Sequence, residues 1–127
     1  MKLRLVVVDD SASFLDEFTS VLSREFDVVA TAMDGKSALE IIRRCQPDVV
    51  ILDLEMPLLN GIEVTMELAK HLPSPAIVIC SVESDPEVVE AAREAGALGY
   101  VFKARITKDL VEAVKSVARG RSFVSPA

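Results

Sequence analysis

Residues 3–10, LRLVVVDD, and residues 47–53, PDVVILD, are short apolar runs that each end in aspartate. Two further runs follow the same plan: AIVICS ends in Ser81, and LGYVFK ends in Lys103. Runs this short and this rich in β-branched residues are typical of strands buried on both faces, which occur in parallel sheets. The sequence therefore predicts a parallel sheet.

Strand-like and helix-like segments alternate along the whole chain, which predicts an α/β fold. We expect strands near residues 3–8, 27–31, 48–52, 76–80 and 98–102. We expect helices near residues 12–24, 35–45, 60–71, 85–95 and 107–119. Five such units imply a doubly wound, five-stranded parallel sheet with helices on both faces. The second strand, DVVATA, is the least apolar and suits an edge of the sheet.

Polar residues and glycines mark the ends of several helices. Asp85 followed by proline predicts an N-cap for the fourth helix, and Thr107 is a candidate N-cap for the fifth. Gly96 and Gly120 stand where helices end in the left-handed conformation. The chain turns polar after Gly120, so we place one domain at residues 1–120 and the start of a linker, or an artificial chain end, at 121–127.

Composition excludes several classes of protein. The chain has 127 residues, of which 50% are hydrophobic and 27% charged, with a formal net charge of −6. This acidity argues against direct binding of nucleic acid, because phosphate contacts need lysine and arginine. No apolar run is long enough to span a membrane, and the N-terminus does not resemble a targeting peptide. We therefore expect no membrane partner and a cytoplasmic location.

Polar side chains follow four of the predicted strands. Asp9, Asp10, Asp53, Ser81 and Lys103 should meet at one edge, because the carboxyl ends of parallel strands lie together. Three clustered carboxylates are unfavourable unless a cation neutralises them. Oxygen ligands of this kind favour a hard divalent metal. The sequence thus predicts a metal site.

Each of these residue types suits phosphoryl chemistry. An aspartate can attack phosphorus and carry an acyl phosphate, while Mg²⁺ neutralises charge on the transferred group. Lys103 can pair with a phosphoryl oxygen, and Ser81 can donate a hydrogen bond once that group is present. Taken singly, each also has an ordinary explanation: a solvated aspartate capping the first helix, a lysine at a strand end, or a serine capping a helix entry.

The chain resembles a response-regulator receiver domain of bacterial two-component signalling over essentially its full length. The residues that carry this resemblance are Asp9-Asp10, Asp53 in ILDLEMPLLNG, Ser81, and Lys103 in GYVFK. The C-terminal stretch DLVEAVKSVARGRSFVSP further resembles receivers of the NarL/FixJ type. The resemblance implies a flavodoxin-like fold with strand order 2-1-3-4-5.

The resemblance also implies roles for individual residues. Asp53 would be the phosphoacceptor, and Asp9 and Asp10 would hold Mg²⁺ with Asp53 and the backbone carbonyl of Glu55. Ser81 and Lys103 would bind the phosphoryl group, and Ser81 would act as a switch residue. Tyr100 matches the aromatic switch position, although it could also be an amphipathic ring on a surface strand.

The implied function is a phosphorylation-dependent switch. It would accept phosphate from a sensor histidine kinase, change the surface around the fourth helix and fifth strand, and control an output such as transcription. Such a domain is not a dedicated enzyme, since it catalyses only its own phosphoryl transfer and dephosphorylation. The partners would be the kinase and, for receivers with apolar surfaces, a second receiver. DNA would be bound only through a helix-turn-helix domain outside this sequence.

Three other functions fit the residues less well. A haloacid-dehalogenase-type phosphatase would need an acid two residues after its nucleophile, but Ser11 follows Asp9 at that spacing. A flavodoxin-like cofactor binder would need a phosphate loop after the first strand, where two carboxylates would repel phosphate. A receiver that only docks partners, without phosphorylation, is disfavoured because the full residue set is present.

Overall fold

The computed structural model describes residues 2–71 and 73–126. Strands and helices alternate as the sequence predicts, with most ends within two residues of the expected positions. The strands are β1 (Arg4–Val8), β2 (Asp27–Ala32), β3 (Val49–Asp53), β4 (Ala76–Ser81), β5 (Gly99–Phe102) and β6 (Phe123–Val124). The helices are α1 (Ala12–Leu22), α2 (Gly35–Cys45), α3 (Gly61–Ala69), α4 (Pro86–Ala95) and α5 (Ile106–Ala118).

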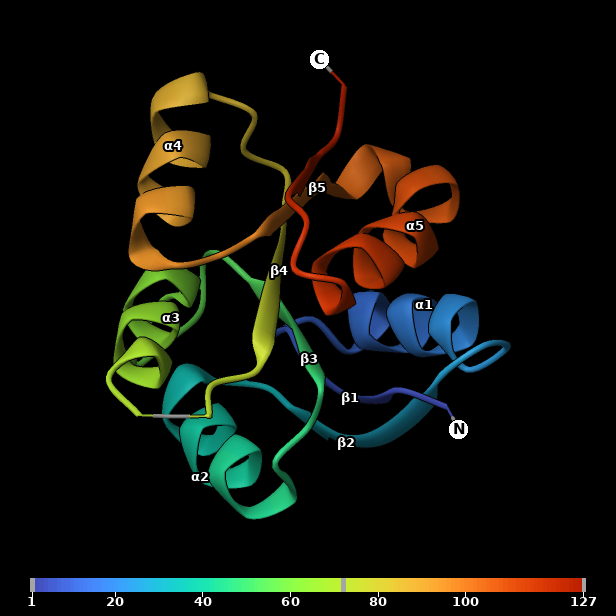
Figure 1. The fold of residues 1–127 in the computed structure, drawn as a ribbon, viewed down its shortest axis with the longest axis vertical. Helices are drawn as coiled ribbons and strands as arrows, with labels where there is room; N and C mark the ends of the chain where they lie inside the picture. The colour runs from blue at the N-terminus through green and yellow to red at the C-terminus, as the bar shows by residue number, and fades with distance from the viewer. Residues whose placement is uncertain (1, 72, 127) are drawn as a thin grey trace.

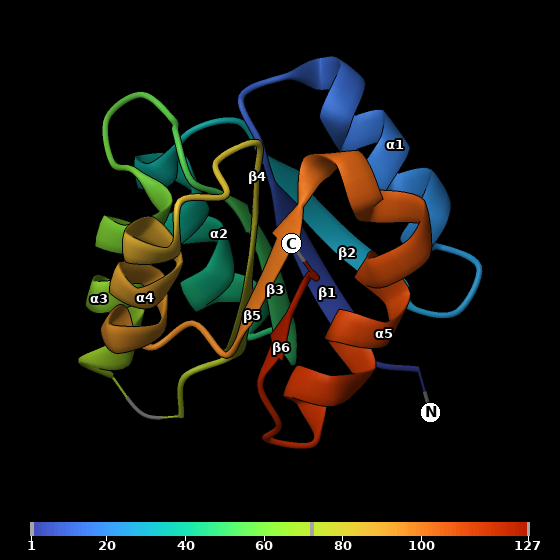
Figure 2. The ribbon, with the colours of Figure 1, turned by 90° about the horizontal axis from the view of Figure 1, so that it is seen from above.

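The strands form one parallel sheet in the order β2-β1-β3-β4-β5-β6. This confirms the predicted order 2-1-3-4-5 and the edge position of β2. Helices α1 and α5 cover one face, and α2, α3 and α4 cover the other (Figure 1, Figure 2). Alternate residues of the central strands supply the two cores, so β1 and β3 are buried on both faces.

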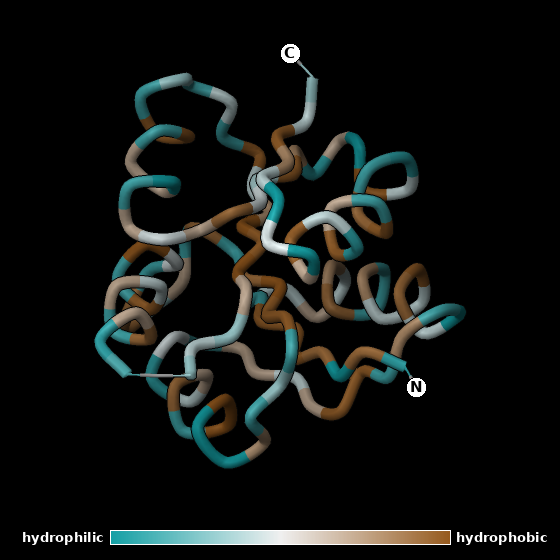
Figure 3. Tube along the Cα trace, viewed as in Figure 1, coloured by the Kyte–Doolittle hydropathy of each residue, from teal (hydrophilic) through white to brown (hydrophobic). Residues whose placement is uncertain are grey.

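The two cores explain why the central strands are almost wholly apolar. Figure 3 shows hydrophobic residues concentrated in these strands and hydrophilic residues on the outer turns of the helices. Phe18 of α1 and Leu110 of α5 are fully buried in the first core. Val64 of α3 and Ala92 of α4 are buried in the second. Among the described residues, every helix is too short or too polar to cross a bilayer.

Two local predictions differ from the structure. The N-cap predicted at Thr107 is wrong, because a 3₁₀ turn at Lys103–Arg105 runs directly into α5. The helix therefore starts at Ile106 without a side-chain cap. The tail beyond Gly120 also holds more structure than a polar linker suggests, since Phe123–Val124 pairs in parallel with β5.

The other predicted helix ends, the N-cap at Asp85 and the terminal glycines Gly96 and Gly120, are confirmed. Asp85 accepts a hydrogen bond from the Glu87 amide at the start of α4, with Pro86 in the first turn. Gly96 and Gly120 have φ angles of 121° and 77°, which favour glycine over residues with a Cβ.

Candidate functional site

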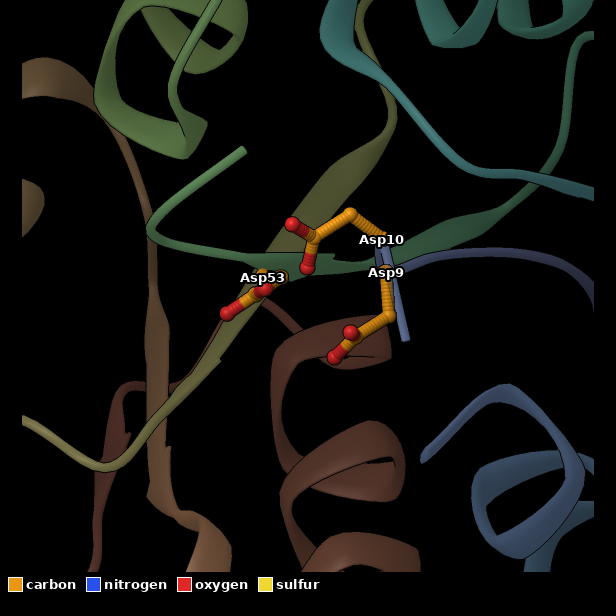
Figure 4. A group of neighbouring side chains, drawn as sticks. All are labelled: Asp9, Asp10 and Asp53. Carbon is orange, nitrogen blue, oxygen red and sulfur yellow. The ribbon is translucent and has the colours of Figure 1, made fainter. Parts of the chain in front are cut away.

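Three carboxylates gather where β1 and β3 end. Asp9 and Asp10 follow β1, and Asp53 is the last residue of β3. One oxygen of each carboxylate lies within 4.8 Å of the others. Figure 4 shows Asp9 and Asp10 leaving the end of β1 in different directions, with the Asp10 carboxylate near Asp53. Asp9 and Asp53 are buried while Asp10 is exposed, so the cluster opens to solvent on the Asp10 side.

Asp9 is the deepest member of the cluster. Its Oδ1 accepts a hydrogen bond from the backbone N–H of Ser11 at 2.9 Å. Its Oδ2 lies 2.9 Å from Lys103 Nζ, but no donor within the described residues is aligned to form a hydrogen bond with it. This buried oxygen is therefore satisfied mainly by its ion pair with Lys103.

Lys103, which follows β5, brings the positive charge into the cluster. Its Nζ lies 3.2 Å from Asp53 Oδ1 as well as close to Asp9, and its side chain is only 9% exposed. The ammonium also lies 4.0 Å from the centroid of the Phe14 ring. Burial by itself would lower the pKa of Lys103, but the Asp9 and Asp53 carboxylates outweigh burial and raise it.

The pKa of Asp53 is raised from an ordinary value of 3.8 to about 6. Burial is the largest cause, because it disfavours the charged form, and the neighbouring Asp9 carboxylate adds to it. Lys103 opposes both effects, and Asp10 contributes least. Asp53 is thus still ionised at neutral pH, but in an environment that destabilises its charge.

The loop after β3 packs closely against Asp53. A Cβ at Gly61 would lie 2.4 Å from the Asp53 carbonyl oxygen, so only glycine fits there. Leu58 in the same loop has a φ of 74°, which is strained for a residue with a Cβ. Asn60 and Glu63 form a capping box that starts α3 beside the site. Glu55 is exposed, and its role as a carbonyl ligand stays a prediction.

Ser81 and Tyr100 meet beside the cluster. Ser81 is buried at the end of β4, and its Oγ accepts a hydrogen bond from the Glu83 N–H at 2.9 Å. The Tyr100 hydroxyl donates to the Glu83 carbonyl at 2.8 Å. Tyr100 is 2% exposed, so its interpretation as a surface ring is wrong. This hydrogen bond of Ser81 lies within the loop before α4, whose N-cap is Asp85, so Ser81 does not cap the helix, and its phosphoryl-binding role stays a prediction.

Phe14 also belongs to the site, but the sequence alone does not identify it as a site residue. In the sequence Phe14 simply fits the apolar stripe of the first helix, and its contact with Lys103 becomes visible only in the structure. Its position gives a usable signal, since it lies in the first turn of α1, which starts just after Asp9 and Asp10. A residue in that turn lies at the same sheet edge as the carboxylates.

The donor set fits a hard divalent cation. Three carboxylates converge within 4.8 Å, and the buried Asp9 Oδ2 has no well-aligned hydrogen-bond donor among the described residues, which suits a metal of this kind. Lys103 supplies one positive charge against three negative ones, so the cluster retains a net negative charge.

Without metal, replacing Asp53 by asparagine is expected to stabilise the fold. An upward pKa change from 3.8 to about 6 corresponds to a penalty of about 3 kcal/mol above pH 6, and solvent on the Asp10 side should reduce it to about 1–2 kcal/mol. Because the folded-state pKa is raised, the penalty fades as pH falls from 6 towards 3.8. Urea melts in chelator at about pH 7.5 and about pH 4.5 would measure both effects.

Excess Mg²⁺ should shrink or reverse the advantage of Asp53→Asn, because the wild type gains binding energy that the variant largely loses. If Asp53→Asn were clearly less stable than wild type in chelator at neutral pH, the carboxylates would not be mutually repelling.

Comparisons with known proteins agree with this geometry. The response regulator receiver domain family matches residues 5–115. The transcriptional regulatory protein DegU of Brevibacillus brevis is 35% identical over 127 residues, which cover 98% of this chain and 54% of DegU. A protein-glutamate methylesterase/protein-glutamine glutaminase of Sulfurimonas denitrificans is 38% identical over 130 residues, which cover 93% of this chain and 37% of that protein.

A solved structure is similar over nearly its whole length. The signal receiver domain of NarL from Mycobacterium tuberculosis superimposes with a TM-score of 0.90 at 34% identity, covering 94% of this chain and 98% of that one. The curated relatives are longer, and this chain spans about half of DegU and less of the methylesterase.

Proposed function

The chain belongs to the response regulator receiver family, and from this membership we propose that Asp53 accepts a phosphoryl group from a sensor histidine kinase. A receiver is a phosphorylation-dependent regulatory domain rather than a dedicated enzyme. The observation that carries the proposal is the buried Asp9–Lys103–Asp53 ion-pair cluster, with Asp10 at its open side. The phosphatase alternative lacks the second acid that its mechanism requires, since Ser11 stands at that position.

The chemistry follows from the state of Asp53. Its pKa of about 6 leaves the carboxylate ionised at neutral pH, and its partial desolvation makes the anion a better nucleophile. A carboxylate oxygen forms the new O–P bond while the P–N bond of the donor phosphohistidine breaks. The electron pair of that bond returns to the imidazole nitrogen, which then takes up a proton.

Other residues of the cluster would hold the reacting groups in place. Asp9, Asp10, Asp53 and the Glu55 carbonyl would hold Mg²⁺, which neutralises charge on the phosphoryl oxygens when bound. Lys103 would exchange part of its ion pair with the aspartates for a phosphoryl oxygen. The Ser81 hydroxyl would donate to another such oxygen.

Tyr100 connects the site to the surface around α4 and β5. Its hydroxyl donates a hydrogen bond to the carbonyl of Glu83, and the N–H of the same residue donates to Ser81 Oγ. A movement of Ser81 towards a phosphoryl group would therefore disturb this loop and the start of α4. We propose this loop as the element through which phosphorylation changes the surface.

The output is proposed from the relatives. DegU is a transcriptional regulatory protein, and a chain of the LuxR family from Aurantimonas sp. superimposes with a TM-score of 0.94 at 31% identity. We propose a transcriptional output through a DNA-binding domain outside this sequence, a cytoplasmic location, and assembly of receivers as homodimers. The methylesterase relative shows that receivers with similar sequences also accompany other activities.

Phosphorylation of the wild-type protein tests the function directly. Incubation with phosphoramidate and Mg²⁺ should add the mass of one phosphoryl group, and peptide mapping should place it at Asp53. The same incubation in chelator should add none, since the carboxylate cluster needs a cation before it can accept a phosphoryl anion. A modification that proceeds equally in chelator, or that maps elsewhere, would contradict the proposal.

A further inference from the structure

The C-terminal tail contains a serine that is almost completely buried. Ser125 is 4% exposed, and its backbone N–H donates to the Tyr100 carbonyl at 2.9 Å. Its Oγ accepts a hydrogen bond from the Phe102 N–H at 3.1 Å and donates one to Asp109 Oδ2 at 2.7 Å. Ser125 thus joins β5 to α5 at a position just beyond β6.

Asp109, in the first turn of α5, is the centre of this network. Besides Ser125, it accepts a hydrogen bond at 2.7 Å from Arg105 Nε, and an Arg105 Nη lies 3.3 Å from its other oxygen. Asp109 is 6% exposed, and its pKa is lowered, first by Arg105 and also by Ser125. The carboxylate is therefore fully partnered and charged.

The network binds the chain both before and after Lys103. Phe102 directly precedes Lys103, and its N–H is bound by Ser125. Arg105 ends the 3₁₀ turn that starts at Lys103, and its side chain is bound by Asp109. Because Ser125 and Asp109 are also bonded to each other, the backbone that carries Lys103 is closed into a hydrogen-bonded ring.

We propose that Ser125, Asp109 and Arg105 are positioning residues that set the place of the Lys103 ammonium in the acidic cluster. We call these three residues the lysine clamp. This inference rests on the proposed function, in which Lys103 binds the phosphoryl group. The position matters because displacements near ~1 Å in a reacting site have large effects on rate and binding.

The lysine clamp also links the tail to the phosphorylation site. Ser125 lies in the tail, so the clamp is complete only when the tail is docked along β5. Coupling between two sites is reciprocal. Occupation of the site by a phosphoryl group should therefore tighten tail docking, and loss of tail docking should weaken phosphoryl binding.

The main experiment compares Ser125→Ala with Ser122→Ala in the full chain. Ser122 lies in the same tail but is exposed, which makes it a matched control. Titration with beryllofluoride, a phosphoryl mimic, in saturating Mg²⁺ should show about three- to tenfold weaker binding for Ser125→Ala, the range of one net hydrogen bond. Mg²⁺ affinity should not fall, because the clamp does not contact the aspartates that would hold the metal, and a displaced Lys103 competes less with Mg²⁺ for them.

Two further measurements separate positioning from loss of structure. Ser125→Thr keeps the hydroxyl and should restore beryllofluoride binding towards the wild-type value. Hydrogen exchange at the Phe102 amide should be faster in Ser125→Ala and unchanged in Ser122→Ala. Beryllofluoride should slow exchange at the Phe123 and Ser125 amides of the wild type, which reports the reciprocal coupling.

Definite outcomes would overturn the proposal. If the Phe102 amide lost protection in Ser125→Ala while beryllofluoride affinity stayed equal to that of Ser122→Ala, the clamp would not position Lys103. A parallel loss of Mg²⁺ affinity would mean that the whole pocket had changed, and would also overturn it. If the wild type bound no beryllofluoride, the proposed function would fail. The clamp would then be tested by amine labelling of Lys103. Labelling should be faster in Ser125→Ala than in Ser122→Ala, and equal rates would contradict the clamp.

Discussion

Replacing Asp53 by asparagine is expected to abolish Mg²⁺-dependent phosphorylation from phosphoramidate, as measured by intact mass. Asparagine has nearly the shape of aspartate, so it should leave the pocket and the Gly61 contact unchanged. It lacks the anionic oxygen that is proposed to attack phosphorus, and the neutral amide is a poor nucleophile. The expected loss is therefore complete within the detection limit, rather than a partial reduction in rate.

Two variants serve as controls for this result. Asp16→Asn removes an exposed carboxylate on α1, away from the cluster, and should be phosphorylated like the wild type. Asp10→Asn keeps the acceptor but removes a predicted metal ligand, so it should be phosphorylated only at higher Mg²⁺ concentrations. A mass gain that persists in Asp53→Asn would refute the assignment of Asp53 as the acceptor.

Replacing Lys103 by methionine should cause a large loss of folding stability. Lys103 is the cation that contacts both buried carboxylates, at 2.9 Å from Asp9 and 3.2 Å from Asp53. Removing one partner of a buried ion pair costs about 3–5 kcal/mol, because it leaves buried charge uncompensated. We expect about 3 kcal/mol at neutral pH in chelator, since Asp53 can relieve part of the repulsion by taking up a proton.

The pH dependence of this loss has a defined sign. Without Lys103, repulsion raises the Asp53 pKa above its wild-type value of about 6. Protonation then removes the repulsion, so the stability difference should shrink as pH falls from about 7.5 towards about 4. The pKa of Lys103 itself is raised from 10.5, which means that its charge is constant across this range.

Urea melts of Lys103→Met and Lys36→Met would test this prediction. Lys36 is exposed at the start of α2 and forms no ion pair among the described residues, so its replacement should have little effect. Equal stabilities of the two variants at neutral pH would show that the buried carboxylates do not depend on Lys103. Excess Mg²⁺ should reduce the difference in folding stability between Lys103→Met and Lys36→Met, because the metal can replace part of the lost positive charge.

The sequence by itself predicted the sheet and the edge where the site lies. Runs such as VVILD are apolar at nearly every position, and such a pattern is stable only where both faces of a strand are covered. Parallel strands then bring their carboxyl ends to one edge, which places Asp9, Asp10 and Asp53 together without further information. These inferences need only local patterns and the regular geometry of strands.

Local patterns did not predict contacts between distant parts of the chain. Thr107 has the side chain of a helix cap, but the preceding 3₁₀ turn has already started α5. The sequence around Tyr100 is compatible with either a surface ring or a buried one. Packing in the second core and the bond to the Glu83 carbonyl, 17 residues away, make it a buried residue.

Only the tertiary structure decided how the site is charged and held. The partners of Lys103 lie far from it in the sequence, and the bond between Phe102 and Ser125 spans 23 residues. From the sequence alone, Ser125 looks like part of a polar tail. Its burial depends on the pairing of the tail with β5, and no local pattern predicts that pairing. The desolvation that raises the Asp53 pKa likewise arises from packing, since burial is set by the assembled chain and not by neighbouring residues in sequence.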